Sequence, residues 1–376
     1  MPRLGPRMLF FSGGTALRET AAEIARYTSN TLHLVTPFDS GGSSAALRRA
    51  FAMPAVGDAR SRVMALADKD RRGNDEVYTL FAYRLPDNES RQFLEREMVR
   101  LLRGSHPLLK QIPEPMNGII REHLIRFSLN MPPDFPLAGA NIGNLVLTAG
   151  YLGQKRRLGP VLALFSRMVR ARGMVRPIVE NTAHLAVRLE TGQILVGQHL
   201  FTGKGGAAVN APIADIWLTA AEDTADPVQV ALRPRIASLI RDGGCIFYPV
   251  GSFYSSVVAN LLPQGVGRAV AANPNPKVFV PNLGNDPELK GHTLEMQIRA
   301  LLRPLQADAP DAHPRDLLSA VLLDQNPSRY PGGVPERLLA ELGIQTIIQP
   351  LVAEGKGPLA DPRLLAQAVL QLAWSR

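Results

Sequence analysis

The sequence predicts an α/β fold built around a parallel sheet. Three observations carry this prediction. A short apolar run ends in a glycine turn and leads into a helical pattern (8–24), a second apolar run leads into a polar loop and another helical pattern (32–50), and two later apolar runs flank a helical stretch (246–280). Strands that alternate with helices in this way are typical of βαβ units.

The first unit contains two strands whose ends carry polar loops. Residues 8–11 are wholly apolar, Gly13 and Gly14 end the run, and apolar side chains then recur at helical spacing up to Ile24. A second apolar run at 32–35 is followed by the polar turn 36–44 and a helical pattern over 45–50. In an open parallel sheet such loops lie where ligands bind.

The remaining chain divides into four parts. Residues 75–135 have apolar residues on one helical face and predict an inserted helical cap, while 177–201 alternates around Gly192 and predicts a hairpin. Strands are predicted at 246–250 and 277–280, with a helical stretch at 254–262 between them. After residue 306, proline-punctuated helical patterns at 338–342 and 364–374, the latter capped by Asp361, predict a helical C-terminal extension. We therefore expect an α/β domain over 1–305 and a helical extension over 306–376.

Composition excludes several classes of protein. The chain has 376 residues, 45% of them hydrophobic, and 42 Lys plus Arg against 33 Asp plus Glu give a net charge of +9, which excludes disordered, collagen-like and disulfide-scaffold chains. Of the cations 35 are Arg and 7 are Lys; this reflects either bidentate recognition of phosphate or carboxylate, or a plain bias toward arginine.

The distribution of charge and apolar residues also bears on partners and compartment. The charges are dispersed and only 6% of residues are aromatic, so we expect no nucleic-acid partner. The single Cys245 is interpreted as a core residue. The apolar run at 8–11 is shorter than a signal sequence and no run approaches the roughly 20 residues of a membrane span. We expect a cytoplasmic protein with no membrane partner.

Phosphate binding is the strongest chemical signal. Gly13, Gly14 and Thr15 follow a predicted strand, where the missing Cβ atoms let backbone N–H groups approach a diphosphate. The alternative is a plain strand-to-helix turn, because the motif is neither G-x-G-x-x-G nor a Walker A loop. The glycines at 203–206 are interpreted as a flexible turn.

Two charged turns offer further candidate ligands. Asp39, at the end of the second strand, is placed to hold a metal ion or orient an acceptor hydroxyl, or else to form an Asx turn or helix cap. Asp58 and Arg60 form either a phosphate clamp or a local ion pair. The seven histidines show no zinc-site spacing, and Gly251 with Ser252 lacks the G-x-S-x-G elbow of a Ser-His-Asp enzyme, so we assign neither chemistry.

Taken together, these loops resemble the superfamily of 2-phospho-L-lactate transferases and gluconeogenesis factors. The resemblance covers roughly residues 7–305. The matching blocks, in order, are Gly13-Gly14-Thr15; Val35-Thr36 leading into Asp39-Ser40-Gly41-Gly42-Ser43-Ser44 and Leu47-Arg48-Arg49; Pro54, Gly57-Asp58 and Arg60; Ala65-Leu66-Ala67-Asp68; Gly143-Asn144-Leu145; Gly251-Ser252-Phe253-Tyr254-Ser255-Ser256 with Asn260-Leu261-Leu262; and Val280 with Asn282, Glu288, Gly291 and Thr293.

The resemblance implies a three-layer Rossmann-like parallel sheet, often dimeric, whose loops hold a nucleotide diphosphate. One branch transfers a phospholactyl-type group from a guanosine diphospho donor to a deazaflavin hydroxyl with Mg²⁺, and the other binds UDP-sugars and regulates. We therefore expect a homodimer that binds a nucleotide diphosphate or a nucleotide sugar.

The resemblance also implies roles for single residues. As a transferase, the chain would use Asp39 to hold Mg²⁺ or orient the acceptor. The nucleotide and its diphosphate would be held by residues of five loops: Gly13, Gly14, Thr15, Ser43, Ser44, Arg48, Asp58, Arg60, Asn144, Gly251 and Ser252.

Several positions depart from the family pattern. Paired aspartates are replaced by Asp39-Ser40, which removes one anionic oxygen donor for a metal ion. Ser61, Val250 and Gln198 stand where the pattern has Asn, Pro and Glu. We expect a divergent CofD-like transferase, with a non-catalytic UDP-sugar-binding regulator as the alternative.

Overall fold

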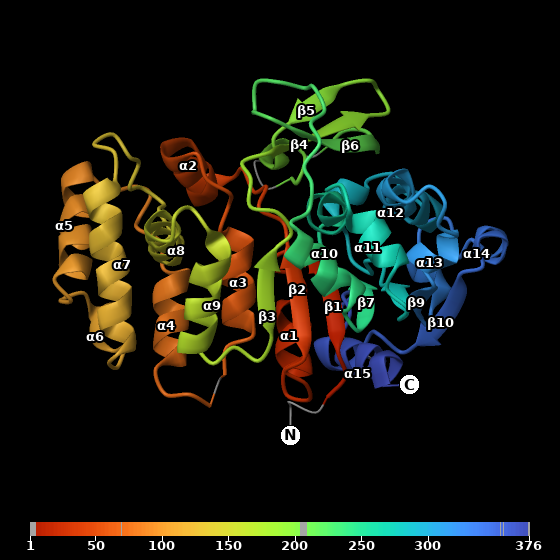
Figure 1. The fold of residues 1–376 in the computed structure, drawn as a ribbon, viewed down its shortest axis with the longest axis horizontal. Coiled ribbons are helices and arrows are strands. Elements are labelled where there is room, and N and C mark those ends of the chain that lie inside the picture. The colour runs from red at the N-terminus through yellow and green to blue at the C-terminus, as the bar shows by residue number, and fades with distance from the viewer. Residues whose placement is uncertain (1–4, 69, 204–208, 354, 356, 375–376) are drawn as a thin grey trace.

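The computed structural model describes residues 5–68, 70–203, 209–353, 355 and 357–374. Its centre is a seven-stranded parallel sheet with the order β10-β9-β8-β7-β1-β2-β3 (Figure 1). The strands are β1 (Met8–Ser12), β2 (Thr31–Val35), β3 (Met174–Pro177), β7 (Cys245–Tyr248), β8 (Lys277–Phe279), β9 (Ala320–Asp324) and β10 (Gln345–Gln349). The predicted α/β, Rossmann-like class is confirmed.

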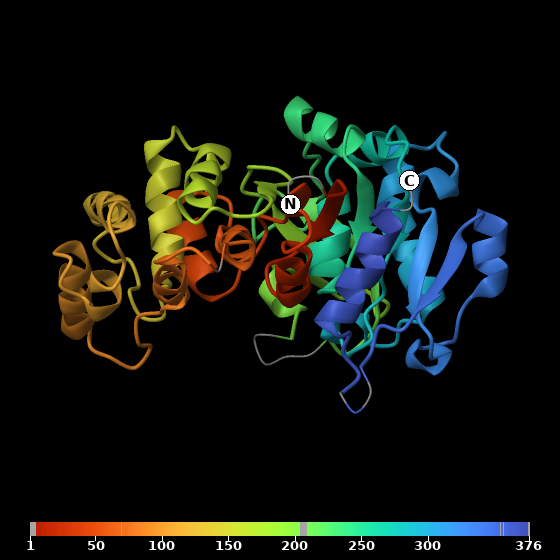
Figure 2. The same ribbon diagram turned by 90° about the horizontal axis from the view of Figure 1, so that it is seen from below.

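The order of the strands changes direction between β1 and β7. From β1 the chain moves through α1 (Arg18–Ile24) to β2 on one side, and from β7 it moves through α11 (Val266–Ala271) to β8 on the other. Because βαβ crossovers are right-handed, the two helices cover opposite faces (Figure 2). The carboxyl ends of β1 and β7 therefore form the switch point at which open α/β sheets bind ligands.

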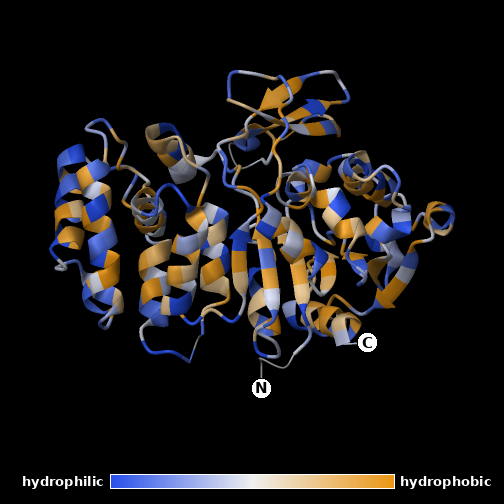
Figure 3. Cartoon of the chain, viewed as in Figure 1, coloured by the Kyte–Doolittle hydropathy of each residue, from blue (hydrophilic) through white to orange (hydrophobic). Residues whose placement is uncertain are grey.

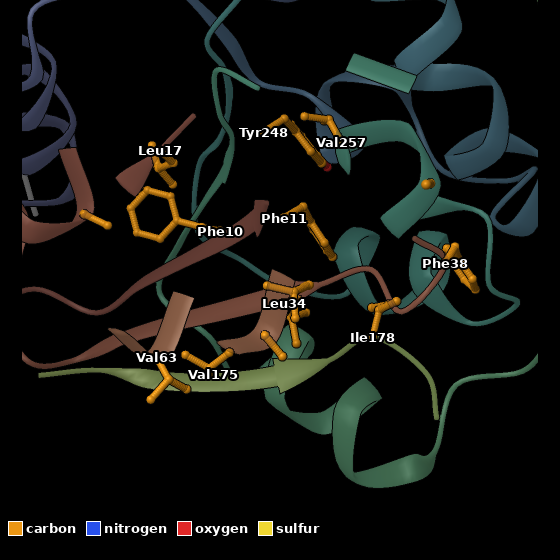
Figure 4. Packing of buried hydrophobic residues seen from close by; sticks show 14 of the residues in the cluster. Phe10, Phe11, Leu17, Leu34, Phe38, Val63, Val175, Ile178, Tyr248 and Val257 are labelled. Atoms are coloured by element: carbon orange, nitrogen blue, oxygen red, sulfur yellow. The ribbon is translucent and has the colours of Figure 1, made fainter. Parts of the chain in front are cut away.

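Alternating side chains of the central strands build the core on both faces of the sheet. Phe10 stacks on Phe247 at 5.2 Å between ring centroids, and Phe11 stacks on Tyr248 at 5.6 Å on the opposite face (Figure 4). Tyr248 is fully buried and its hydroxyl donates to the Leu317 carbonyl at 2.8 Å. These apolar strands fix the position of the loops that follow them.

A helical lobe occupies the side of the molecule next to β3 (Figure 1). It follows α2 (Gly42–Phe51) and α3 (Gly57–Ala65) and comprises α4 (Asn74–Ala82), α5 (Arg91–Leu102), α6 (Pro107–Lys110), α7 (Met116–Asn130), α8 (Ile142–Gly153) and α9 (Leu158–Met168). Hydrophilic and hydrophobic residues share the surface of α5 and α7, as expected of helices with one buried face (Figure 3). The segment 75–135 expected to form a helical cap contains α4 to α7.

A small antiparallel sheet lies beyond the carboxyl ends of the main strands (Figure 1). The hairpin expected over 177–201 pairs β4 (His184–Leu189) with β5 (Ile194–Val196), and Gly192 takes a positive φ of 87° in its turn. A third strand, β6 (Ile213–Thr219), pairs with the other edge of β4. A short 3-10 helix η2 (Gln198–Leu200) leads out of the hairpin. Residues 204–206 of the expected glycine turn lie outside the described residues.

The stretch between β7 and β8 is helical, but not a single α-helix. It begins as a π-helix η3 (Phe253–Val257), continues as a 3-10 helix η4 (Val258–Leu261) and ends in α11. The π-helical turn follows Gly251 and Ser252 directly, and such turns are frequent at functional sites. Helix α10 (Pro234–Arg241) precedes β7.

The C-terminal segment has the expected helices and also extends the sheet. It comprises part of α12 (Leu294–Asp308), then α13 (Pro314–Leu317), β9, η6 (Pro327–Arg329), α14 (Glu336–Leu342), β10 and α15 (Pro362–Trp374), with η5 (Pro287–Leu289) before α12. Helix α12 crosses residue 305, and β9 and β10 pair in parallel with the preceding strands, so no boundary falls at 305. These strands were not expected because β9 (AVLLD) and β10 (QTIIQ) are five residues long, too short to carry a period that separates strand from helix.

Among the described residues, no helix is both long enough and apolar enough to cross a bilayer.

Candidate functional site

The glycine turn after β1 lies against the start of α3. A Cβ atom added at Gly14 would fall 2.6 Å from Asp58 Oδ1, and one added at Gly13 would collide with the Ser256 hydroxyl. The two glycines are therefore required by the close approach of three chain segments. They bring the turn, Asp58 and the segment after Gly251 to one place.

Asp39 forms the Asx turn that sequence reasoning left as an alternative. Its Oδ1 accepts a hydrogen bond from the Gly41 N–H at 3.1 Å, at the entry to α2. The other carboxylate oxygen, Oδ2, lies 3.6 Å from the position that a Gly57 Cβ would take. The side chain of Asp39 is half-buried. Its Oδ1 is used by the Asx turn, and its Oδ2 lies near the start of α3.

The N-termini of three helices converge beside Asp39. Measured from a Cβ added at Gly57, the first residue of α3, Ser44 Oγ of α2 lies at 3.2 Å and Asn144 Nδ2 of α8 at 3.9 Å. Ser43 Oγ ties α2 to α8 by accepting from the Asn141 N–H at 3.1 Å. The helices have 10, 9 and 12 residues, and the positive ends of their dipoles favour an anion at this point.

Asn144 has an unused polar atom at this junction. The residue is 2% exposed, its backbone N–H is capped by Asn141 Oδ1 at 2.9 Å, and its side-chain Oδ1 has no hydrogen-bond partner among the described residues. Buried polar atoms are rarely left without a partner, so the junction has a free acceptor that fits a ligand or a water molecule. The predicted residues Ser43, Ser44 and Asn144 are thus brought together.

The two predicted arginines are engaged elsewhere. Arg48 is 6% exposed and donates to the carbonyls of Phe38, Asp39, Thr182 and Ala183 at 2.7–3.4 Å, so it ties the second loop to the start of the small sheet. Arg60 donates to the Phe81 carbonyl at 2.6 Å. Burial lowers the pKa of both guanidinium groups to about 10. These contacts tie both arginines to the loops, and their role in holding a phosphate remains a prediction.

Sequence reasoning missed a third arginine beneath the glycine turn. Arg62 of α3 is fully buried and its Nη2 donates to the Gly13 carbonyl at 2.6 Å. Burial lowers its pKa to about 10, while the charge of Asp58 acts in the opposite direction. The spacing of four residues between Asp58 and Arg62 puts both on one face of α3 and was the signal available in the sequence.

The loop after β7 is held by side chains from the loop after β8. Asn282 Oδ1 accepts from the Gly251 N–H at 2.9 Å and its Nδ2 donates to the Gly251 carbonyl at 2.6 Å. Asp286 Oδ2 accepts from the Phe253 N–H at 2.8 Å, which fixes the start of the π-helical turn. Asn282 was part of the family resemblance, but no role was assigned to it.

Glu288 binds the next turn of the same segment. Its Oε2 accepts from the N–H groups of Tyr254 and Ser255, both at 2.8 Å, and its Oε1 accepts from the Ser255 hydroxyl at 2.5 Å. Burial, together with the neighbouring charge of Asp286, raises the pKa of Glu288 to about 7. The backbone around Gly251 and Ser252 therefore depends on a buried, readily protonated carboxyl group.

A cavity of about 680 Å³ opens between the loops after β1, β7 and β8. Thr15, Gly251 and Ser252 line it, together with Asn282 and the C-terminal segment 357–362. The predicted residues thus fall into two groups, one around this cavity and one around Asp39, which are joined by the contact of Gly14 with Asp58.

One further pair lies next to Asp39. Ser40 Oγ accepts from the His199 N–H at 3.2 Å and is 2.8 Å from His199 Nδ1, so the small sheet is anchored to the second loop at this residue. Ser40 stands where a second aspartate was expected from the family pattern, and its hydroxyl is taken up by this contact.

A metal ion held by the protein alone needs several donor side chains in one place. The described part of the chain has no group of three or more His, Cys, Asp and Glu side chains placed to hold a metal ion. Asp39 lies in the loop before α2, and Asp58 lies in the first turn of α3. Magnesium is commonly held by one or two carboxylates together with the phosphates of a ligand, so these residues fit a shared ion and not an all-protein cage.

Comparison with solved structures agrees with the architecture. The chain aligns with a UPF0052-family protein from Bacillus halodurans at a TM-score of 0.70, with 22% sequence identity, over 98% of this chain and 99% of that one. A second structure of the same Bacillus halodurans protein aligns at a TM-score of 0.69 and 23% identity, over 97% of this chain and 99% of that one.

Sequence comparison gives relatives with one recurrent name. A putative gluconeogenesis factor from Nostoc sp. is 25% identical over 98% of this chain and 68% of that protein. The gluconeogenesis factor of Bacillus subtilis is 24% identical over 79% of this chain and 74% of its own length. The family model described as 2-phospho-L-lactate transferase CofD matches residues 8–333. With its switch-point loops and this match along most of its length, the chain belongs to the CofD family.

Proposed function

We propose that the loops at the ends of β1, β2 and β7 bind the diphosphate of a nucleotide-linked ligand. The observation that carries the proposal is the convergence of the N-termini of α2, α3 and α8 on Gly57 beside Asp39. The glycines at 13 and 14 let the turn approach Asp58 and Ser256 closely, and the side-chain amide of Asn144, whose Nδ2 lies 3.9 Å from the position of a Gly57 Cβ, can donate to a phosphate oxygen. The cavity next to Gly251 and Ser252 has room for the rest of the nucleotide.

We further propose that the protein is a CofD-like transferase. An acceptor hydroxyl forms a bond to the distal phosphorus of the donor, the bond from that phosphorus to the bridging oxygen breaks, and a nucleoside monophosphate leaves with the electron pair. Asp39 accepts the hydrogen bond of the attacking hydroxyl and passes its proton to solvent. A magnesium ion held by Asp39 and Asp58 would supply neutralisation of the phosphate charge.

A second function is favoured by two observations. First, Ser40 is hydrogen-bonded to His199 and takes the place of a second aspartate, so the loop offers a metal ion one carboxylate, that of Asp39. Second, relatives of the chain carry the name gluconeogenesis factor. In this alternative the same loops bind a UDP-sugar without turnover, and the bound state is read by another protein. The expected homodimer and cytoplasmic location belong to both functions and remain predictions.

The test is the thermal shift of the purified chain with GDP and with UDP-N-acetylglucosamine, each with and without Mg²⁺. A ligand at 100 times its dissociation constant stabilises by about 2.7 kcal/mol, which for a chain of this length corresponds to a rise in Tm of about 3 °C. A magnesium-dependent shift with GDP supports the transferase, and a metal-independent shift with the UDP-sugar supports the regulator. No shift with either ligand refutes the diphosphate site.

The variant that separates the two functions is Asp39→Asn. It keeps the acceptor oxygen for the Gly41 N–H but removes the charge, so a transferase loses turnover by about a hundredfold or more while its nucleotide still binds. Asp134→Asn, at an exposed position of the helical lobe, is the matched control. Release of GMP from a GDP-linked donor is the assay, and undiminished release by Asp39→Asn contradicts the assigned role.

A further inference from the structure

We propose that Arg62 is the positioning residue of the phosphate-binding turn: from beneath the turn it holds the Gly13 carbonyl inward, presents the Gly14 N–H to the ligand, and opposes the charge of the diphosphate. The inference rests on the proposed diphosphate site. It concerns a residue that touches the turn from its buried side and not the ligand itself.

The direction of the Gly14 N–H follows from the geometry of the peptide group. Arg62 is 0% exposed, and its Nη2 draws the Gly13 carbonyl toward the interior with a 2.6 Å hydrogen bond. The cis peptide bond of the described chain is Glu114–Pro115, so the bond between Gly13 and Gly14 is trans. In a trans peptide the C=O and N–H vectors are opposed, and the Gly14 N–H therefore points away from Arg62, out of the core.

The guanidinium is poorly compensated where it lies. Its Nε and Nη1 are buried and have no hydrogen-bond partner among the described residues. The neighbouring ring of His33 is fully buried, and its pKa is held well below the usual range by that burial and by the charge of Arg62. Burying an incompletely bonded cation costs free energy that an apolar side chain of similar size would not cost.

Arg62 is unfavourable for the stability of the fold, yet it contacts the phosphate-binding turn at Gly13. Its presence is best explained by a contribution to binding of the ligand. Asp58, one helical turn before Arg62, also approaches Gly14 and partly offsets the cation. The remaining positive charge lies under the backbone at which a diphosphate would arrive, and it interacts strongly because little water separates the two. Arg62 is thereby assigned to affinity for the phosphates and not to affinity for the base.

The test compares Arg62→Met, Arg62→Lys and Arg62→Gln with the wild type. The measured quantities are the Tm without ligand and the dissociation constants of inorganic pyrophosphate, of the nucleotide that shifts the wild type, and of the corresponding nucleoside. Arg156→Met is the matched control, because Arg156 also donates to backbone carbonyls, those of Phe51 and Ala52, away from the glycine turn.

We expect Arg62→Met to retain or raise the Tm of the free protein and to weaken pyrophosphate and the nucleotide by at least about tenfold, with no change for the nucleoside. Arg62→Lys, which keeps the charge and a donor, should recover most of the affinity, and Arg62→Gln should recover less. If Arg62→Met does not fold, the pyrophosphate affinities of Arg62→Lys and Arg62→Gln are compared instead. Equal affinities of these two variants refute a role for the charge.

Two results overturn the inference, and both differ from a failure of the proposed site. A lower Tm with unchanged pyrophosphate affinity makes Arg62 a structural residue. An equal loss of affinity for nucleoside and nucleotide shows a general distortion of the pocket. Failure of the diphosphate site itself appears earlier, as a wild type that binds neither pyrophosphate nor nucleotide.

Discussion

Replacing Glu288 by Gln should change how the stability of the protein depends on pH. The carboxyl group is fully buried and accepts the N–H groups of Tyr254 and Ser255 on one oxygen and the Ser255 hydroxyl on the other. Glutamine preserves this arrangement, because its amide oxygen accepts the two N–H groups and its NH2 donates to the hydroxyl. The substitution therefore removes the titration of the group and leaves the contacts in place.

The magnitude follows from the pKa of the carboxyl group. Burial raises it from 4.5 to about 7, and at about 1.4 kcal/mol per pH unit this difference corresponds to about 3 kcal/mol. Since the folded pKa is the higher one, the unfolded chain loses its proton first as the pH rises. The stabilising contribution is complete below pH 4.5, declines between 4.5 and about 7, and is lost above that window.

The assay is urea unfolding of the wild type and Glu288→Gln at pH 5 and at pH 8. The free energy of unfolding of the wild type, relative to the variant, should fall by about 3 kcal/mol between the two pH values, and the variant should show no decline from this position. Parallel pH profiles of the two proteins would refute the reasoning, because they would mean that Glu288 is not protonated in the folded state at pH 5 or that its surroundings stay hydrated.

Three other substitutions test single contacts. Gly14→Ala places a Cβ 2.6 Å from Asp58 Oδ1 and 3.0 Å from its Cα; we expect a loss of about 2 kcal/mol in urea unfolding and weaker nucleotide binding, and unchanged values would contradict the close approach. Asp324→Asn removes a buried carboxylate that accepts the N–H groups after β10, at 2.9 and 3.2 Å, and an arginine at 3.1 Å; a drop of about 3 kcal/mol in one cooperative transition is expected, whereas a separate early transition would mean that the C-terminal strands unfold on their own. Tyr248→Phe leaves the Leu317 carbonyl without its 2.8 Å bond and should cost about 1 kcal/mol, measured against the exposed Tyr27→Phe, and equal stability of the two variants would count against that bond.

Local patterns sufficed where a segment carries its own signal. Residues 8–11 are apolar at every position, and two glycines follow shortly after them. This pattern identifies the buried strand β1 and the turn after it without any tertiary information. The glycine at 192 between alternating residues identified the β4–β5 hairpin. The strands β9 and β10 were missed because their short runs acquire strand character from pairing with β8 and with each other.

The candidate site divides in the same way. The sequence by itself determined which loops carry glycines, hydroxyls and carboxylates, because parallel strands place the loops after them at one edge of the sheet. Only the tertiary structure decided which side chains serve the fold. Arg48 and Arg60 are engaged by backbone carbonyls, and Arg62 lies under the Gly13 carbonyl. Which partner an arginine contacts depends on carbonyls that are distant in the chain and come within reach only when the fold is complete, so no local pattern encodes it.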